Sequence, residues 1–231
     1  MTRALLILVL ATLGIAVAFL VFPGIDRAVE AALLVGPDGR FLLEGVGWPR
    51  AINATVPWLI ATLAGGLVVL GACRLLGRPV GGIGWRQIAY ILAVFVIGPG
   101  LLVNTLLKDH LGRARPRDVQ ASEEQATFTP PFMPSTACET NCSFPSGDAS
   151  AAFAFIAVAL VAPRRWRGAG VAGAVALGSF YGAIRMLQGA HYLSDVIFAG
   201  LLVALVAVGL HVLVFREDAA KPGGRASSRT T

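Results

Sequence analysis

Long apolar stretches with almost no charge constrain the fold of this chain more than any other feature of its sequence. A helix needs about 17 to 25 mostly apolar residues to cross a bilayer, and six stretches approach that length once their flanks are counted. They cover residues 4–22, 56–76, 88–107, 149–162, 169–184 and 193–215. Hydrophobic residues make up 56% of the chain and charged residues only 14%, which is rare in a soluble domain. We therefore expect an all-α fold, a bundle of six transmembrane helices.

Positive charge predicts which way this bundle faces. Two short connections contain arginines and no acid, and such connections face the cytoplasm in membrane proteins. Their arginines are Arg74, Arg78 and Arg86 in the first and Arg164, Arg165 and Arg167 in the second. By alternation, loops 23–55, 108–147 and 185–192 face the outer side. We expect residues 1–215 to form one membrane-embedded domain and residues 216–231 a basic, disordered cytoplasmic tail.

The composition also excludes several classes of protein. The net charge of +6 is not arranged as a basic stripe interleaved with aromatic residues, so we expect no nucleic-acid partner. The three cysteines and three histidines form no cluster with metal-ligand spacing, so we expect neither a metal nor a cofactor.

In loop 23–55, Val29 and Leu33 favour an interfacial helix, and no residue there suggests chemistry.

The last outer loop carries charged residues that suit phosphate chemistry. His191 and Asp195 are four residues apart, so on a helix the carboxylate can orient the imidazole and leave its second nitrogen as a nucleophile or base. Arg185 adds a planar guanidinium, the side chain best suited to bind phosphate through two hydrogen bonds. The alternative interpretation is that these residues are solvated groups at the mouth of a membrane helix.

The long outer loop brings further candidates for binding an anion. Lys108 and Arg115 lie near a helix end and a proline-terminated turn, where both can reach the oxygens of one tetrahedral anion. Ser146 and Gly147 stand where the fourth apolar stretch begins, so a hydroxyl and unpaired helix-start amides can cradle a phosphate. Two alternatives stay open: Ser146 as an ordinary helix cap, and Lys108, Arg113 and Arg115 as contacts to lipid headgroups.

Three motifs together resemble a known family. They are Lys-x6-Arg-Pro at residues 108–116, Pro-Ser-Gly-Asp at 145–148 and Arg-x5-His-x3-Asp at 185–195. In this order, and with six spans, they resemble the signature of the type-2 phosphatidic acid phosphatase superfamily. The resemblance implies a metal-independent membrane phosphatase in which His191 attacks phosphorus, forms a phosphohistidine and is held by Asp195. It also implies a set of residues that bind the phosphoryl oxygens: Lys108, Arg115, Ser146, Gly147 and Arg185.

One departure from that signature concerns the proton donor. The second motif of the family usually ends in a histidine that protonates the leaving alkoxide, and here Asp148 takes its place. A carboxyl near a helix start and beside cations favours its ionised form. Three assignments stay open: Asp148 is protonated only in the substrate complex, His110 or a water supplies the proton, or Asp148 is the base for water. A fourth interpretation is an inactive relative.

The acid at residue 148 and the segment from Cys138 to Cys142 resemble the branch that contains bacterial lipid A 4′-phosphatases. This resemblance implies a lipid phosphate substrate, with lipid A 4′-phosphate favoured over polyprenyl diphosphate and phosphatidate, in the bacterial inner membrane with a periplasmic active site. Cys138 and Cys142 then face an oxidising compartment, so they form either a disulfide or two free thiols. A lipid phosphotransferase and a non-catalytic lipid-binding protein are the rival functions, and the motifs leave the oligomeric state open.

Overall fold

The computed structural model describes residues 2–36, 38–121 and 127–220, and its regular structure is almost entirely helical. Five long segments cross the molecule: α1 (Thr2–Val21), α4 (Val56–Leu75), α5 (Trp85–Phe95) continued by the π-helix η1 (Val96–Leu107), α9 (Arg164–Leu187) and α10 (Leu193–Ala220). The short helices are α2 (Gly24–Leu33), α3 (Gly47–Asn53), α6 (Pro116–Ala121), α7 (Gly147–Phe153) and α8 (Ile156–Val161). The strands β1 (Leu34–Val35) and β2 (Arg40–Phe41) form a small antiparallel hairpin.

Five of the six predicted spans correspond to helices that are long and apolar enough to cross a membrane. These are Thr2–Val21, Gly47–Leu75, Trp85–Leu107, Arg164–Leu187 and Leu193–Arg216. The remaining predicted span is the shorter apolar segment Gly147–Val161, made of α7 and α8. The result is an all-α membrane protein. Of the predicted tail, residues 221–231 lie outside the described residues.

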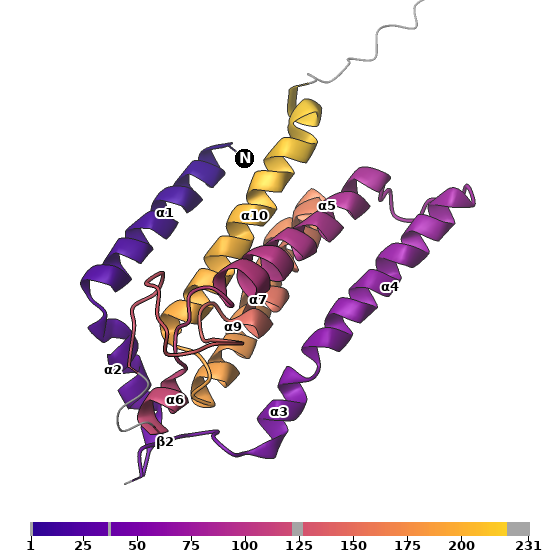
Figure 1. The fold of residues 1–231 in the computed structure, drawn as a ribbon. Helices are drawn as coiled ribbons and strands as arrows, with labels where there is room; N and C mark the ends of the chain where they lie inside the picture. The colour runs from indigo at the N-terminus through magenta and orange to yellow at the C-terminus, as the bar shows by residue number, and fades with distance from the viewer. Residues whose placement is uncertain (1, 37, 122–126, 221–231) are drawn as a thin grey trace, which may run out of the picture.

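The short segment α7–α8 occupies the centre of the bundle, between α9, α10 and η1 (Figure 1). Small residues allow this close packing. A Cβ atom at Gly178 of α9 would lie 2.4 Å from the ring of Phe153, and one at Gly182 would lie 2.2 Å from Val196. Because α7 and α8 are largely covered by protein, their length does not have to match the thickness of a bilayer.

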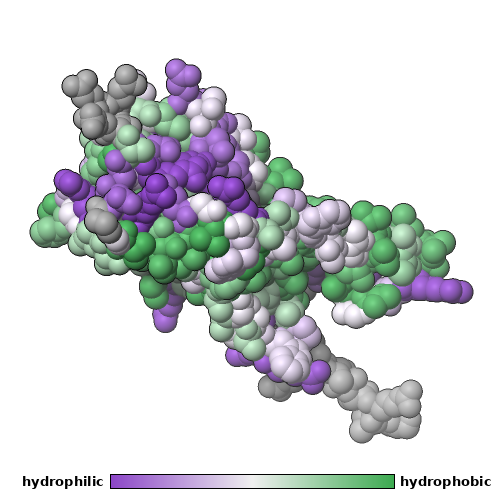
Figure 2. Space-filling model, turned by 90° about the horizontal axis from the view of Figure 1, so that it is seen from below, coloured by the Kyte–Doolittle hydropathy of each residue, from purple (hydrophilic) through white to green (hydrophobic). Residues whose placement is uncertain are grey.

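The polar loops gather at one end of the bundle. In Figure 1, α2, α3, α6 and the chain around residues 108–146 lie at the lower end, opposite the start of α1. Figure 2 shows this end as a hydrophilic patch bordered by hydrophobic surface. Trp48 on α3 is 54% exposed, and Trp58 on α4 is 74% exposed. Exposed tryptophans at this level are typical of a membrane–water interface.

Candidate active site

His191 lies in the turn between α9 and α10 and is 2% exposed. Its Nδ1 atom is 2.6 Å from the carbonyl oxygen of Ser143 and 3.4 Å from Oδ2 of Asp195. A carbonyl oxygen can only accept a hydrogen bond, so the network assigns the proton of the neutral ring to Nδ1. Nε2 then carries the lone pair, which is the form of histidine that a nucleophile requires.

The charge state of His191 suits the same role. Burial lowers the pKa of His191 to about 4, although its contact with Asp195 acts in the opposite direction. The guanidinium groups of Arg185 and Arg115 lower this pKa further. The imidazole is therefore neutral at physiological pH, and its free nitrogen is unprotonated.

Asp195 holds the surroundings of the imidazole as well as the ring itself. Its Oδ2 atom accepts hydrogen bonds from the hydroxyl of Ser143 at 2.5 Å and from the backbone N–H of Tyr192 at 2.8 Å. The carbonyl of Ser143 binds His191, and Tyr192 follows His191 in the chain, so Asp195 fixes the backbone on both sides of the ring. The sequence predicted a direct contact between the carboxylate and the imidazole. The contact is present at 3.4 Å, but the closest partner of the ring is the Ser143 carbonyl.

Three predicted phosphate-binding cations share one electrostatic environment. Burial, together with the neighbouring Arg115, lowers the pKa of Lys108 to about 8, and Arg185 acts in the same direction. Burial and the charge of Arg185 also lower the pKa of Arg115. Arg115 is fixed by a 2.6 Å hydrogen bond from Nη2 to the carbonyl of Asn141. Partly or fully buried cations that repel one another are stabilised when an anion binds among them, so this cluster favours a phosphate.

The second predicted motif lies against the first. A Cβ atom at Gly147 would lie 2.6 Å from Oδ1 of Asn104 and 3.4 Å from Nζ of Lys108, so only glycine allows this approach. Ser146 is fully buried, and its hydroxyl has no hydrogen-bond partner among the described residues. A buried hydroxyl without a partner is unfavourable unless a ligand satisfies it. Ser146 is therefore available to bind a phosphoryl oxygen.

The two candidate proton donors differ in their surroundings. Oδ2 of Asp148 lies 3.3 Å from Nε of Arg185, so this carboxylate forms an ion pair with one of the predicted phosphate-binding residues. His110 is exposed, and its Nδ1 lies 3.2 Å from the carbonyl of Thr105. Asp148 is thus part of the charged cluster, whereas His110 contacts the backbone in the last turn of η1.

Arg113 is the first of two functional candidates that the sequence interpretation missed. It was considered only as a contact to lipid headgroups, but the side chain is 1% exposed. Its Nη1 donates to Oδ1 of Asp195 at 2.5 Å and to the hydroxyl of Ser194 at 2.8 Å. Its Nη2 donates to Oδ2 of Asp26 at 2.8 Å. Although burial disfavours the charge, Asp195 and Asp26 outweigh it and raise the pKa of Arg113.

Asp26 corrects the expectation that loop 23–55 carries no chemistry. This residue lies on α2 and is 1% exposed. Besides Arg113, it accepts hydrogen bonds from the backbone N–H and the hydroxyl of Ser194, at 2.8 Å and 2.5 Å. The helix is amphipathic as expected, but it turns a carboxylate into the protein. Asp26, Arg113 and Asp195 form a buried chain of charges, the Asp26–Arg113–Asp195 relay, that reaches the surroundings of His191.

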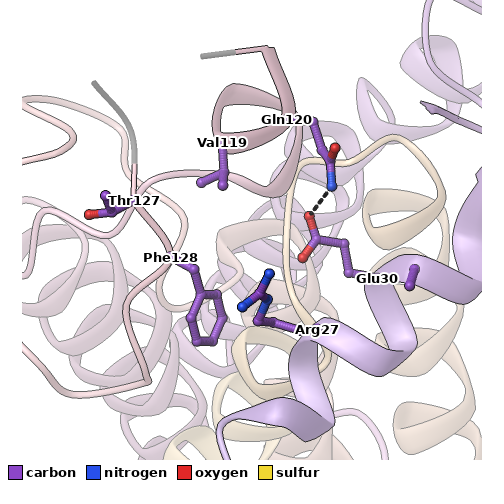
Figure 3. Close-up of a pocket in the computed structure, with 7 residues that line it drawn as sticks. Arg27, Glu30, Val119, Gln120, Thr127 and Phe128 are labelled. Atoms are coloured by element: carbon purple, nitrogen blue, oxygen red, sulfur yellow. Dashed lines mark hydrogen bonds between the residues drawn. The ribbon is translucent and has the colours of Figure 1, made fainter. Parts of the chain in front are cut away.

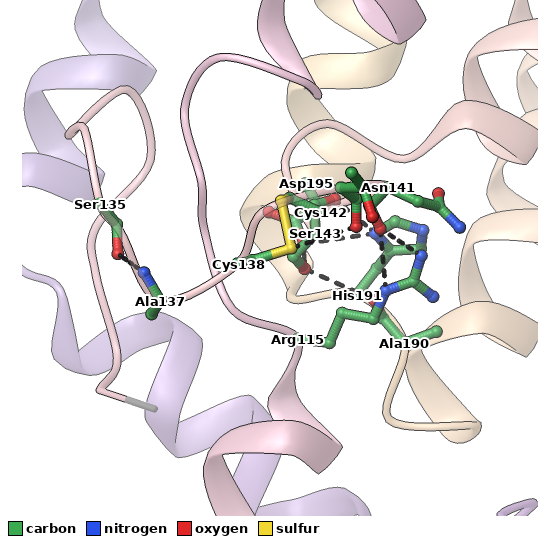
Figure 4. The surroundings of a disulfide bond; sticks show 11 residues. Arg115, Ser135, Ala137, Cys138, Asn141, Cys142, Ser143, Ala190, His191 and Asp195 are labelled. Atoms are coloured by element: carbon green, nitrogen blue, oxygen red, sulfur yellow. Dashed lines mark hydrogen bonds and ion pairs between the residues drawn. A yellow bond between two sulfur atoms is a disulfide. The ribbon is translucent and has the colours of Figure 1, made fainter. Parts of the chain in front are cut away.

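A disulfide joins Cys138 to Cys142 beside this site, with 5.7 Å between the two Cα atoms. Figure 4 shows the bond next to Arg115 and His191. Asn141, just before Cys142, provides the carbonyl that binds Arg115, and Ser143, just after it, provides the carbonyl that binds His191. The bond therefore constrains both backbone acceptors.

A separate cavity of about 360 Å³ lies between α2 and α6 (Figure 3). Gln120 donates a 3.3 Å hydrogen bond to Oε1 of Glu30 at its wall. Burial raises the pKa of Glu30. Arg27, Thr127 and Phe128 complete its polar and aromatic lining, and none of the predicted site residues is part of it.

Comparison with known proteins points to one family. A family model described as the PAP2 superfamily matches residues 88–219. A lipid A 4′-phosphatase of Francisella tularensis subsp. novicida (strain U112) is 40% identical over 135 residues, which cover 58% of this chain and 61% of that protein. A lipid A 4′-phosphatase of Rhizobium leguminosarum is 35% identical over 128 residues, 55% of each chain.

A lipid A 1-phosphatase of Rhizobium etli (strain ATCC 51251 / DSM 11541 / JCM 21823 / NBRC 15573 / CFN 42) is 43% identical over 113 residues, 49% of this chain and 44% of that protein. The chain thus spans about half the length of the curated relatives it matches. No solved structure matches the chain significantly.

Proposed function

This chain belongs to the PAP2 superfamily, and from that membership we propose that it is a membrane phosphatase acting on a lipid phosphate. We propose lipid A as the substrate and its 4′-phosphate as the group removed, because three of the relatives are lipid A 4′-phosphatases. The observation that carries the proposal is the neutral, buried His191 beside a cluster of cations. A nucleophile and positive charge at one place are what phosphoryl transfer needs.

The first chemical step uses the free nitrogen of the imidazole. Nε2 of His191 attacks phosphorus, a bond from nitrogen to phosphorus forms, and the bond from phosphorus to the lipid oxygen breaks. Lys108, Arg115 and Arg185 neutralise the charge on the phosphoryl oxygens, and the hydroxyl of Ser146 binds one of them. The lipid alkoxide takes a proton from water. Its departure leaves a phosphohistidine.

The second step releases phosphate. A water attacks phosphorus, its proton passes to Asp148, and the bond from phosphorus to nitrogen breaks to restore the imidazole. Asp148 then gives this proton to the hydroxide that the first step left, which restores the carboxylate. We assign Asp148 the role of base because its carboxylate belongs to the charged cluster, 3.3 Å from Nε of Arg185. With water as the proton donor of the first step, this assignment adopts two of the alternatives left open by the sequence. It predicts that an Asp148→Asn variant still forms phosphohistidine but hydrolyses it slowly.

The proposed site faces the periplasm from the bacterial inner membrane. Two connections lie at the opposite end of the bundle from the site, where the positive-inside rule predicts cytoplasm. The connection 76–84 contains Arg78 between the helix-end residues Arg74 and Arg86, and the connection between α8 and α9 precedes Arg164, Arg165 and Arg167. A disulfide beside the site agrees with an oxidising compartment. Lipid headgroups of the outer leaflet would reach the site from the level of Trp48 and Trp58.

The test is phosphate release from lipid A by the purified protein in detergent or nanodiscs. We expect His191→Ala to reduce the rate by about four orders of magnitude or more, because the nucleophile is lost. His110→Ala is the matched control, since it removes an exposed histidine from the same end of the molecule, and we expect wild-type rates from it. Wild-type activity in His191→Ala would reject the mechanism. If the phosphate of the substrate is radiolabelled and the label is recovered in an added lipid acceptor and not in free phosphate, the protein is a phosphotransferase.

A further inference from the structure

A second polar cavity opens beside the proposed catalytic cluster. It has a volume of about 390 Å³, within the range of small-molecule sites. Six residues line it: Leu43, Glu44, Gly45, Arg50, Arg117 and Gln188. We call it the Arg50 cavity. Its walls come from the segment after β2, from α3, from the start of α6 and from the end of α9.

Three contacts place the Arg50 cavity next to the phosphate-binding cations. Oε1 of Gln188 accepts hydrogen bonds from Nη1 of Arg185 at 3.4 Å and from Nδ2 of Asn53 at 2.7 Å. The backbone N–H of Arg117 donates to the carbonyl of Gly189 at 2.9 Å. The charge of Arg117 is also among those that lower the pKa of Arg115. A group bound in the cavity would therefore be adjacent to a phosphate held by Arg185 and Arg115.

The lining of the cavity selects a class of ligand. Arg50 and Arg117 offer guanidinium donors that suit an anionic substituent, while Glu44 and Gln188 offer acceptors that suit hydroxyl or amide groups. Oε2 of Glu44 accepts a hydrogen bond from the backbone of Phe41, which fixes the carboxylate at the wall. A mixture of donors and acceptors with little apolar surface fits a phosphorylated saccharide better than a simple glycerol or prenyl chain.

We propose that the Arg50 cavity binds the saccharide portion of the substrate headgroup, next to the phosphate that is removed. This inference rests on the proposed phosphatase function and adds the residues that choose the substrate. The residues proposed for catalysis lie within the region 88–219 that the family model matches, whereas Leu43, Glu44 and Arg50 precede it. The N-terminal segment thus adapts a common catalytic site to a sugar-bearing lipid.

The experiment compares two substrates that present the same phosphomonoester. Lipid A carries it on a sugar, and phosphatidate carries it on glycerol. We expect Arg50→Gln to lower the ratio of kcat/KM for lipid A to that for phosphatidate by about tenfold, the loss of one charge-assisted hydrogen bond. Glu44→Gln should lower the same ratio by a smaller factor. Arg40→Gln is the matched control, because Arg40 is exposed on the neighbouring β2 and does not line the cavity.

A binding measurement separates this inference from the proposed function. In the His191→Ala background, the dissociation constant of a soluble bis-phosphorylated glucosamine disaccharide is measured with and without Arg50→Gln. We expect weaker binding by about tenfold for the disaccharide and a smaller change for glycerol phosphate. An unchanged substrate ratio with unchanged disaccharide binding would overturn the inference. If the disaccharide binds as expected but the wild-type protein releases no phosphate from any lipid, the proposed function fails and the cavity remains a saccharide site.

Discussion

At the scale of single residues, the pKa of Lys108 sets the upper pH limit of the proposed reaction. Burial and Arg115 lower this pKa to about 8, so the ammonium charge is present below pH 8 and is lost as the pH rises through that value. Because kcat/KM reports the ionisation of the free enzyme, we expect it to decline above about pH 8. The measurement is the pH dependence of phosphate release in nanodiscs.

Lys108→Arg tests the assignment of that decline. Arginine keeps its charge throughout the accessible pH range, so the variant should lose the decline near pH 8 even if its maximal rate is lower. The histidine contributes no competing change there, because the pKa of His191 is lowered to about 4. A decline of unchanged position in Lys108→Arg would show that another group is responsible.

Asp26 is expected to act on catalysis through Arg113 and Asp195. Asp26→Asn keeps the size of the side chain but removes the charge that compensates Arg113, and breaking a buried charge pair costs about 3 to 5 kcal/mol in stability. We expect kcat to fall by about tenfold with little change in KM, because the orientation of the His191 ring is disturbed and the binding of the substrate is not. Steady-state kinetics and thermal unfolding measure the two effects.

Glu30→Gln is the control for this prediction. Glu30 is the other buried acid of α2, one helical turn away, but its hydrogen bond is with Gln120 and it takes no part in the Asp26–Arg113–Asp195 relay. We expect the kinetics of Glu30→Gln to resemble those of the wild type. A proportional loss of kcat in both variants would mean that Asp26 only maintains the packing of α2.

The residues of the candidate site differ in how far the sequence could predict them. His191, Asp195 and Arg185 could be predicted because they stand within one short segment, at spacings that have a direct chemical meaning. The relay could not, because Asp26 and Arg113 are 87 residues apart and no local pattern marks either as buried. The sequence could not predict that the Ser143 carbonyl is the closest partner of the His191 ring either, because any residue type can provide a backbone acceptor.

At the scale of elements, the disulfide is expected to keep residues 138–143, which precede α7, in their active conformation. Cys138→Ser with Cys142→Ser should lower stability by about 2 kcal/mol, as expected for a short closed loop. We expect activity to fall by about tenfold, because the carbonyls that bind Arg115 and His191 lose their constraint. Phosphate release and thermal unfolding are compared with those of Cys73→Ser, which removes the free cysteine of α4. Equal values for the two variants would reject this role.

The elements themselves were largely predictable from hydropathy. Each of the predicted apolar stretches is helical, one of them as the two short helices α7 and α8, because a chain in a bilayer has to satisfy its backbone hydrogen bonds internally. Hydropathy showed that the stretch 149–162 is short, but it could not predict that the segment α7–α8 is covered by α9 and α10 and not by lipid. The π-helix η1 was also unforeseen. Within it, Nδ2 of Asn104 bonds the carbonyl of Pro99, and Lys108 follows its last turn.

At the scale of the whole molecule, the distribution of arginines predicts the orientation in the membrane. Asp38 lies in the hairpin at the end that carries the candidate site, and Arg78 lies in the connection between α4 and α5 at the opposite end. The positive-inside rule predicts that Arg78 faces the cytoplasm, so we expect Asp38 to face the periplasm. Both side chains are exposed, so a cysteine at either position would be accessible to a reagent.

Cysteine labelling in intact cells tests this orientation. In a Cys73→Ser background, Asp38→Cys should react with a membrane-impermeant maleimide, whereas Arg78→Cys should react only after the inner membrane is opened. The background without an added cysteine is the control, since Cys138 and Cys142 are joined in a disulfide and do not react. The reverse pattern would place the candidate site in the cytoplasm. It would then remove the access to outer-leaflet headgroups on which the choice of lipid A depends, while the chemistry proposed for His191 would be unaffected.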